Sequence, residues 1–350
     1  IEMLTVDAAD PAPRIIFDSN FAVSGNFEEG HGGAIRVGDC LGQGSGGPND
    51  KLFVSLRGVL FDGNRAADDG GSLRIGDDLY DTDALVTITN CEFNANQADT
   101  GNGGGLALGA LGDDAVLDIN DLTATSNTAN NGSGGMLYLS TAGSNLEVDV
   151  EGVTATSTVS SNQSDDGGAL FIGPSVGPMR FGCDDVLWNN NSAQGGGKGG
   201  AVLLQGLSSG SAMTVDIDND VTFSGNSADN QGGAIAVESA GDNFILDVRP
   251  ANTEVAFTNN SGNTGGGGAI SVEGAGSNCQ FFFDGSAGNN VVFSNNSGGA
   301  IGGGAVLIDQ LVDAGEVWFG DVQCTSNSAS GDGGMLHLGP SNVGTTVQLG

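Results

Sequence analysis

Residues 221–226 of this 350-residue chain read VTFSGN, and residues 232–237 read GGAIAV. The first block is a V/F-x-x-N tetrapeptide that closes on Asn226, and the second opens on the pair Gly232 and Gly233. The two blocks recur ten times along the chain, and each Gly pair starts five to eight residues after its Asn. Successive Gly pairs begin 30 to 38 residues apart. A repeat of this length that is built from short strand-like runs predicts a solenoid with one coil per repeat.

Each repeat contains three short runs in which apolar and polar residues alternate. In the seventh repeat these runs cover residues 215–217, 221–223 and 235–237. Alternation with period two is typical of a strand with one face inward and one outward. Three such strands per coil predict an all-β fold, a right-handed parallel β-helix of about ten coils, with the handedness taken from the general rule for parallel crossovers. Strands stacked about 4.8 Å apart would give a rod about 50 Å long.

The two landmarks of the repeat have a physical explanation. An Asn at the same turn of every coil tolerates left-handed backbone geometry and can pass amide hydrogen bonds along the stack, while the Gly pair supplies positive φ before the next strand. We therefore expect a structural Asn ladder. Its members are Asn26, Asn64, Asn96, Asn127, Asn162, Asn191, Asn226, Asn260, Asn296 and Asn327.

The charge balance limits the classes of partner. The chain has 43 acidic and nine basic residues, a net charge of −34, which disfavours nucleic acid and anionic membrane surfaces. No apolar stretch is long enough to span a membrane. We expect an extracellular or cell-surface protein that has protein partners or assembles with itself along the rod. Because the chain opens and closes inside strand-like runs, we expect residues 1–350 to be one β-helix taken from a longer polypeptide.

Two outward columns of side chains follow when the coils are aligned. In the first, the residue between the two inward aliphatic positions after the Gly pair is apolar in the middle repeats, which gives a candidate contact stripe of Tyr138, Phe171 and Leu203. A contiguous apolar stripe is typical of a lateral contact surface. The favoured alternative is that the loops of the chain itself cover it or that its exposure is tolerated.

In the second column, Arg180 falls between the acidic residues Asp149 and Asp216. Like charges on neighbouring strands repel, so we expect Arg180 to form a salt bridge between coils with Asp149 or Asp216, worth about 0.2 to 1 kcal/mol. The acidic neighbours Asp118 with Asp149 and Asp216 with Asp247 are weak candidates for Ca²⁺, which needs six to eight oxygen ligands. Solvated repulsion is the favoured interpretation, so the sequence predicts no metal and no cofactor.

Five N-x-S/T sequons are present, and in a secreted eukaryotic protein such sequons accept glycans. Asn162 belongs to the expected ladder, so we expect it to be bare. The remaining candidates for glycosylation are Asn131, Asn190, Asn259 and Asn295.

The motifs resemble a known repeat. Residues 32–35, 232–235 and 267–270 read GGAI, and residues 17–20, 61–64, 93–96, 223–226, 257–260 and 293–296 read FxxN. This pairing is similar to the repeat of the chlamydial polymorphic membrane proteins and extends over nearly the whole chain. The resemblance implies a surface-exposed β-helical passenger, often adhesive and exported as an autotransporter. Several repeats differ, among them residues 70–73, which read GGSL.

Three function classes follow, and the first is favoured. It is a non-enzymatic structural rod or scaffold at the cell surface, as a component of an appendage or assembly. The second is an adhesin passenger that binds a cell-surface receptor. The third, a β-helical carbohydrate-active enzyme, needs carboxylates clustered with a base, and only Arg180 with Asp149 and Asp216 approaches this arrangement.

Overall fold

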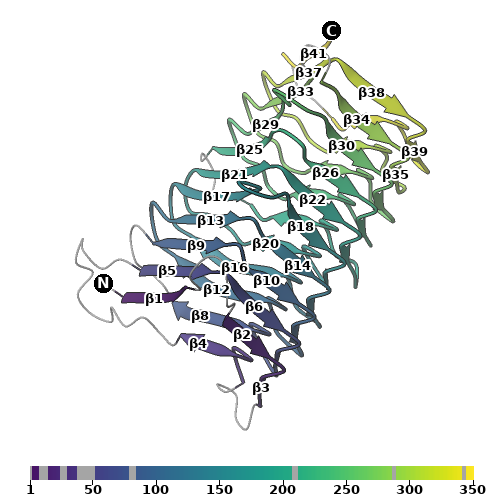
Figure 1. The fold of residues 1–350 in the computed structure, drawn as a ribbon. Helices are drawn as coiled ribbons and strands as arrows, with labels where there is room; N and C mark the ends of the chain where they lie inside the picture. The colour runs from purple at the N-terminus through teal and green to yellow at the C-terminus, as the bar shows by residue number, and fades with distance from the viewer. Residues whose placement is uncertain are drawn as a thin grey trace.

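The computed structural model describes residues 2–7, 15–23, 30–37, 52–78, 84–206, 212–285, 289–340 and 344–350. All helical and strand elements in these residues are β-strands, and they stack in rungs from the N-terminal to the C-terminal end (Figure 1). All pairings between neighbouring strands are parallel, and each joins one turn of the chain to the next. The fold is therefore a parallel β-solenoid with four sheets, here named A to D in the order in which the chain enters them.

Sheets A and B form the first two sides of each turn. Sheet A has eleven described strands, which are β1 (Glu2–Asp7), β5 (Leu52–Arg57), β9 (Leu85–Thr89), β13 (Val116–Asn120), β17 (Leu146–Glu151), β21 (Met179–Asp184), β25 (Met213–Ile217), β29 (Ile245–Val248), β33 (Gln280–Asp284), β37 (Glu316–Gly320) and β41 (Thr346–Leu349). Sheet B has ten, which are β2 (Ile15–Asp18), β6 (Val59–Asp62), β10 (Glu92–Asn94), β14 (Thr123–Thr125), β18 (Ser157–Ser160), β22 (Val186–Asn189), β26 (Thr222–Ser224), β30 (Val255–Thr258), β34 (Val291–Ser294) and β38 (Val322–Thr325).

Sheets C and D complete the turn. Sheet C has ten described strands of two residues, which are β3 (Phe21–Ala22), β7 (Arg65–Ala66), β11 (Gln97–Ala98), β15 (Thr128–Ala129), β19 (Gln163–Ser164), β23 (Ser192–Ala193), β27 (Ser227–Ala228), β31 (Ser261–Gly262), β35 (Ser297–Gly298) and β39 (Ser328–Ala329). Sheet D has ten, which are β4 (Ile35–Val37), β8 (Leu73–Asp78), β12 (Leu106–Leu111), β16 (Leu137–Ala142), β20 (Leu170–Ile172), β24 (Val202–Leu204), β28 (Ile235–Val237), β32 (Ile270–Val272), β36 (Val306–Ile308) and β40 (Leu336–Leu338).

The prediction of three strands per coil was therefore incomplete. Sheets A, B and D correspond to the three alternating runs, but the two-residue strands of sheet C directly after the Asn were missed. Two residues are too few to display an alternating pattern. They nevertheless pair from turn to turn, as Ser192–Ser227 and Ala193–Ala228 do in β23 and β27. The parallel β-helix class is confirmed, and its right-handed winding stays a prediction.

One continuous hydrophobic core fills the inside of the solenoid. Several of its largest members come from the inward position of the V/F-x-x-N tetrapeptide in sheet B. Trp188, Phe223, Phe257 and Phe293 occupy that position in four successive turns, are fully buried, and stack ring on ring with centroids 5.0 to 5.7 Å apart. Offset stacking of this kind adds to the stability that burial of the rings provides.

The two glycines of each pair have different roles. The first adopts positive φ in all ten repeats, as Gly199 does at +66°, a conformation that favours glycine. The second lies against the next turn, because a Cβ placed on Gly200 would come within 2.0 Å of the carbonyl oxygen of Gly233. Glycine is therefore required at the first position for its backbone conformation and at the second because there is no room for a side chain.

Candidate functional site

The Asn ladder is present at the corner between sheets B and C, and its members from Asn64 to Asn296 are buried. Each of these buried Asn side chains bonds to the Asn of the turns on both sides. The Nδ2 of Asn226, for example, donates to Oδ1 of Asn260 and to the carbonyl oxygen of Trp188, and its Oδ1 accepts from the backbone N–H and Nδ2 of Asn191, all at 2.9 to 3.0 Å. Because both donors and both lone pairs are used, burial leaves no polar atom of this amide unpaired.

The first rung of the ladder differs from the prediction. Asn20 donates from its backbone N–H and from Nδ2 to Oδ1 of Asn64, at 3.0 and 2.8 Å. Asn20 belongs to the tetrapeptide whose Phe17 pairs with Phe61 in sheet B. The predicted member Asn26 lies outside the described residues. Two tetrapeptides occur in succession in this repeat, and the first of them supplies the ladder residue.

The left-handed residue of the turn was also assigned to the wrong position. The residue before each ladder Asn, and not the Asn itself, has a φ between 50° and 66°. These residues are Ser19, Gly63, Ala95, Ser126, Ser161, Asn190, Gly225, Asn259, Asn295 and Ser326. A left-handed residue at this point reverses the chain direction and lets the following amide point inward.

The predicted contact stripe is covered by the chain itself. Phe171 and Leu203 are 6% and 1% exposed and form a small cluster with Ala236 on the outer side of sheet D, against which half-buried Tyr138 packs. The rings of Tyr138 and Phe171 stack with centroids 5.1 Å apart. The prediction of an exposed lateral surface here was therefore wrong, and the alternative of cover by the chain's own turns fits the burial.

Residues before two of the Gly pairs lie over this column. The carboxamide Oε1 of Gln231 accepts a hydrogen bond from the Ser271 hydroxyl at 2.8 Å. At Leu307 the turn residue is glycine, and a Cβ on Gly266 would meet the Leu307 side chain at 3.0 Å. The turn before the strand therefore covers the column at these two positions.

Lys198 covers the outer face of sheet D in another way. Its ammonium lies 2.8 Å from Glu238 Oε1 and 2.8 Å from Glu273 Oε2, residues that follow β28 and β32. The side chain thus reaches from the turn before β24 across to the far ends of the next two strands. The two carboxylates raise the pKa of Lys198 against the opposing effect of its burial. The ammonium therefore stays charged and ties three turns together.

Arg180 forms the salt bridge between coils that the sequence predicts. Its guanidinium donates to Asp149, to Glu147 Oε1 at 3.2 Å and to Asp216 Oδ2 at 3.2 Å. The register differs from the prediction, however, because Gly182, and not Arg180, pairs with Asp149 and with Asp216. Glycine leaves the space above its backbone open, and the guanidinium occupies it, since a Cβ on Gly182 would lie 3.0 Å from both terminal nitrogens of Arg180.

The weak calcium candidates all have donors from the chain. Asp149 and Asp216 face Arg180, Asp247 forms an ion pair with Arg249, and Asp118 Oδ1 accepts from Asn120 Nδ2 at 2.7 Å. These donors offset the repulsion along the acidic column. The side chains therefore have partners within the protein that a cation would need to displace.

Carboxylic groups on the outer face of sheet A still resist ionisation. Glu151 and Asp184 pair in register on β17 and β21, and Asp218 directly follows β25. The pKa of Asp218 is raised to about 6. Burial of the carboxyl group is the largest cause, and the negative charges of Asp216, Asp184 and Asp247 add to it. Burial likewise raises the pKa of Glu151 and of Asp184. This face therefore takes up protons at a higher pH than isolated carboxylates do.

Within the described residues, one other group could bring three ligand atoms together. His31, Asp68 and Asp69 have ligand atoms that all lie within 4.8 Å of one another. The Nδ1 of His31 already accepts from the backbone N–H of Asp69 at 3.3 Å, and Arg74 lies 3.8 Å from Asp69 Oδ2. A metal ion would have to break this hydrogen bond or replace the guanidinium, so the arrangement fits internal pairing better than metal binding.

The His31 contact belongs to a second ladder that the sequence reading missed. The side chain before the Gly pair accepts from the backbone N–H of the next turn, as Asp69 does from Asn102 at 2.6 Å and Asn102 does from Ser133 at 2.8 Å. Asp166 accepts from Lys198 in the same way, at 3.0 Å. Polar residues before successive Gly pairs are the signal that could have identified it.

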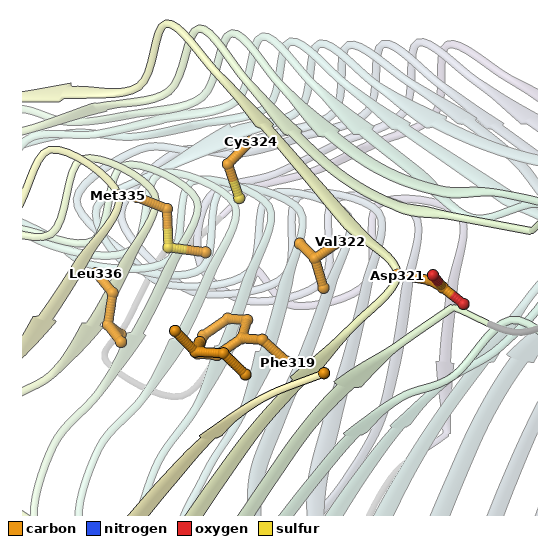
Figure 2. A pocket seen from close by; sticks show the side chains of 8 residues that line it. Phe319, Asp321, Val322, Cys324, Met335 and Leu336 are labelled. Atoms are coloured by element: carbon orange, nitrogen blue, oxygen red, sulfur yellow. The ribbon is translucent and has the colours of Figure 1, made fainter.

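A cavity of about 330 Å³ lies beside the last described rungs of the core. Figure 2 shows the side chains of Phe319, Val322, Cys324, Met335 and Leu336 around it. Cys324 pairs in register with Phe293 and is exposed, whereas Cys91, Cys183 and Cys279 are buried, and all four are free thiols. The lining residues are mostly apolar core side chains of the last described rungs, and Asp321 lies at the rim of the cavity.

This fold and ladder define a class, the parallel β-solenoid with an internal Asn ladder. The model of the Chlamydia polymorphic membrane protein repeat matches residues 220–238 and 254–273. Both segments contain a tetrapeptide with its ladder Asn and the following GGAI block. The chain is thus a polymorphic-membrane-protein-like β-helix. Comparisons with curated proteins and with solved structures gave no match. No helix in the described residues is long and apolar enough to cross a membrane.

Proposed function

We propose that the chain is a non-enzymatic rod or scaffold at the cell surface, working through protein partners or self-assembly along its length. The observation that carries this proposal is the ladder from Asn20 to Asn327, in which each Asn bonds to the Asn of the next turn and the members from Asn64 to Asn296 are buried. A stiff element of constant cross-section is the product of such a repeat. The similarity to the Chlamydia polymorphic membrane protein repeat supports the surface location.

The charged residues also favour a structural role over catalysis. The guanidinium of Arg180 is engaged by three carboxylates, so it holds the sheet A face together. A glycosidase or lyase needs a group free to move a proton near pH 7. A catalytic role for this cluster is the least supported of the three candidate functions.

The location is tested with an antibody raised against the folded chain. We expect it to label intact cells that make the protein as strongly as permeabilised cells, and we expect external protease to remove the label. Labelling that requires permeabilisation would contradict a surface location. A cytoplasmic marker protein, labelled only after permeabilisation, is the control.

The second candidate function is an adhesin, and the repeat similarity is the observation that favours it. Beads coated with the chain separate the two functions. Saturable attachment to cells, in competition with soluble chain, would support an adhesin. Attachment of the beads to one another, or end-to-end and side-by-side particles in electron micrographs, would support a scaffold.

A further inference from the structure

Four of the five sequon asparagines are exposed and have left-handed backbone geometry. Asn190, Asn259 and Asn295 have φ of 53°, 58° and 55°, and Asn131 has a φ of 58°. Each lies in a turn with its side chain at the surface. N-x-S/T in an exposed turn is the acceptor motif for Asn-linked glycans.

Three of these asparagines occupy the same place in the repeat. Asn190, Asn259 and Asn295 each directly precede a ladder Asn, at the corner between sheets B and C. The rungs that carry them are in register, since β23 pairs with β27, β27 with β31 and β31 with β35. The three side chains therefore form a row on one edge of the solenoid, while Asn131 follows β15 on the other side of sheet C.

The other two residues of each sequon in this row already have structural roles. The middle residue is the ladder Asn, and the third is the serine that opens a strand of sheet C, namely Ser192, Ser261 or Ser297. The hydroxyls of Ser192 and Ser261 are half-buried, and that of Ser297 is exposed. A change at the serine therefore removes the acceptor motif without altering the left-handed Asn or the ladder.

The fifth sequon serves as an internal control. Asn162 is 1% exposed, and its amide bonds to Asn127, Asn191 and the carbonyl oxygen of Ala124. The serine of this sequon, Ser164, is also buried and donates to the carbonyl oxygens of Asp166 and Gly167. A sugar on Asn162 would break the ladder, so a folded chain has no room for it.

We propose that Asn131, Asn190, Asn259 and Asn295 accept Asn-linked glycans, and that three of them place a row of sugar along the edge between sheets B and C. In the transfer, Nδ2 of the Asn forms a bond to C1 of the sugar of a lipid-linked glycosyl diphosphate. The bond between C1 and the diphosphate oxygen breaks, Nδ2 loses one proton, and the lipid diphosphate leaves. A glycosyltransferase of the secretory route catalyses the step. This inference rests on the proposed extracellular location.

A sugar row on this edge has a consequence for the partners of the rod. It would keep other proteins away from the corner between sheets B and C. The outer face of sheet A, which contains Arg180, lies away from this row.

The test is secretion of the chain from eukaryotic cells, followed by enzymatic release of N-glycans in ¹⁸O-labelled water and peptide mass mapping. We expect the Asn-to-Asp mass change at positions 131, 190, 259 and 295, and none at 162. Modification of Asn131 alone would overturn the row, and absence of glycan at all four positions in a secreted, folded chain would overturn the proposal. Modification of Asn162 in folded protein would overturn it too.

Matched serine variants separate the acceptor motif from the fold. Ser192→Ala, Ser261→Ala and Ser297→Ala should each remove one glycan, whereas the corresponding Ser→Thr changes should keep it. Circular dichroism and thermal unfolding of the same variants, made without glycans in bacteria, verify that they fold. Antibody labelling of intact source cells reports separately on location, so failure of the surface location and failure of the glycan sites are distinguishable.

Discussion

The corner that holds the Asn ladder and the outer face of sheet A are built on the same rungs, yet they differ in how much they change from turn to turn. At the corner, Asn recurs from turn to turn, and the members from Asn64 to Asn296 are buried in a continuous row of bonded amides. On the face of sheet A, the column changes from Asp149 to Gly182 to Asp216 to Asp247 to Phe282. A buried position whose side chain must bond to its copy in the adjacent turns accepts one residue type. A position that faces solvent accepts many.

The largest effect is expected at the ladder. Asn226→Ala would remove four buried hydrogen bonds in turns 6 to 8. The backbone N–H of Asn191 and the carbonyl of Trp188 would lose their partner, and Nδ2 of Asn191 and Oδ1 of Asn260 would each lose one of two partners. Since each buried unpaired polar group costs about 1 to 3 kcal/mol, we expect a loss of about 4 kcal/mol or more. Denaturant unfolding followed by circular dichroism measures it. Asn190→Gly, at the exposed left-handed position, is the control. Equal midpoints for the two variants would contradict the structural role of the ladder.

The second effect concerns the glycine contact between turns. Gly200→Ala would place a methyl group 2.0 Å from the Gly233 carbonyl oxygen, and we expect overpacking to cost about 2 to 3 kcal/mol. Gly63→Ala is the matched control. Its Cβ would meet a single atom at 3.6 Å, and Ala95 already holds the equivalent left-handed position one turn later. If thermal unfolding shows the two variants to be equally stable, the steric role of the second glycine is wrong.

A smaller effect is expected on the face of sheet A. Arg180→Met removes the cation shared by three carboxylates, and since the arginine is 39% exposed, the loss should be about 1 kcal/mol. High salt should reduce the difference, because it screens the repulsion that remains. The exposed pair of Arg65 and Asp99 provides the control, since Arg65→Met should leave the urea midpoint unchanged. A deficit that salt does not reduce would point to lost packing of the arginine stem.

The smallest effect is a dependence on pH. Because the pKa of Asp218 is about 6 in the folded chain, against an ordinary value of 3.8, the folded state binds its proton more readily than the unfolded state does. Stability should therefore increase as the pH falls from above 6 toward 4. Asp218→Asn should stabilise the chain at pH 7 by less than about 1 kcal/mol and flatten this part of the profile. Thermal unfolding between pH 4.5 and 7.5 measures both. A profile that is the same in the variant would contradict the assignment to Asp218.

The sequence predicted the parts of the molecule where one residue type is required at one position. Ladder asparagines and paired glycines recur because each contacts its own copy in the next turn, so their spacing alone gives the coil. Sheet C was missed because its strands have two residues. The register at Arg180 was shifted by two residues because Arg180 and Gly182 both face outward, and only the structure shows that the long side chain fills the place that the glycine leaves empty.

The covered stripe shows a different limit. Alternation correctly placed Phe171 and Leu203 on the outer side of sheet D. It could not show that they are buried, because alternation along a strand gives only the side of the sheet on which a side chain lies. A side chain that points outward from a solenoid is therefore not necessarily exposed to solvent.

The direction of the backbone hydrogen bonds has a mechanical consequence. All four sheets bond from turn to turn, so these bonds lie along the axis of the rod. Tension applied along that axis would load the bonds of one rung at a time and peel the turns away in succession. Each released repeat of 30 to 38 residues would add roughly 100 to 140 Å of contour length. The rod would therefore lengthen many-fold before it broke, and the successive unfolding of its turns would dissipate mechanical energy.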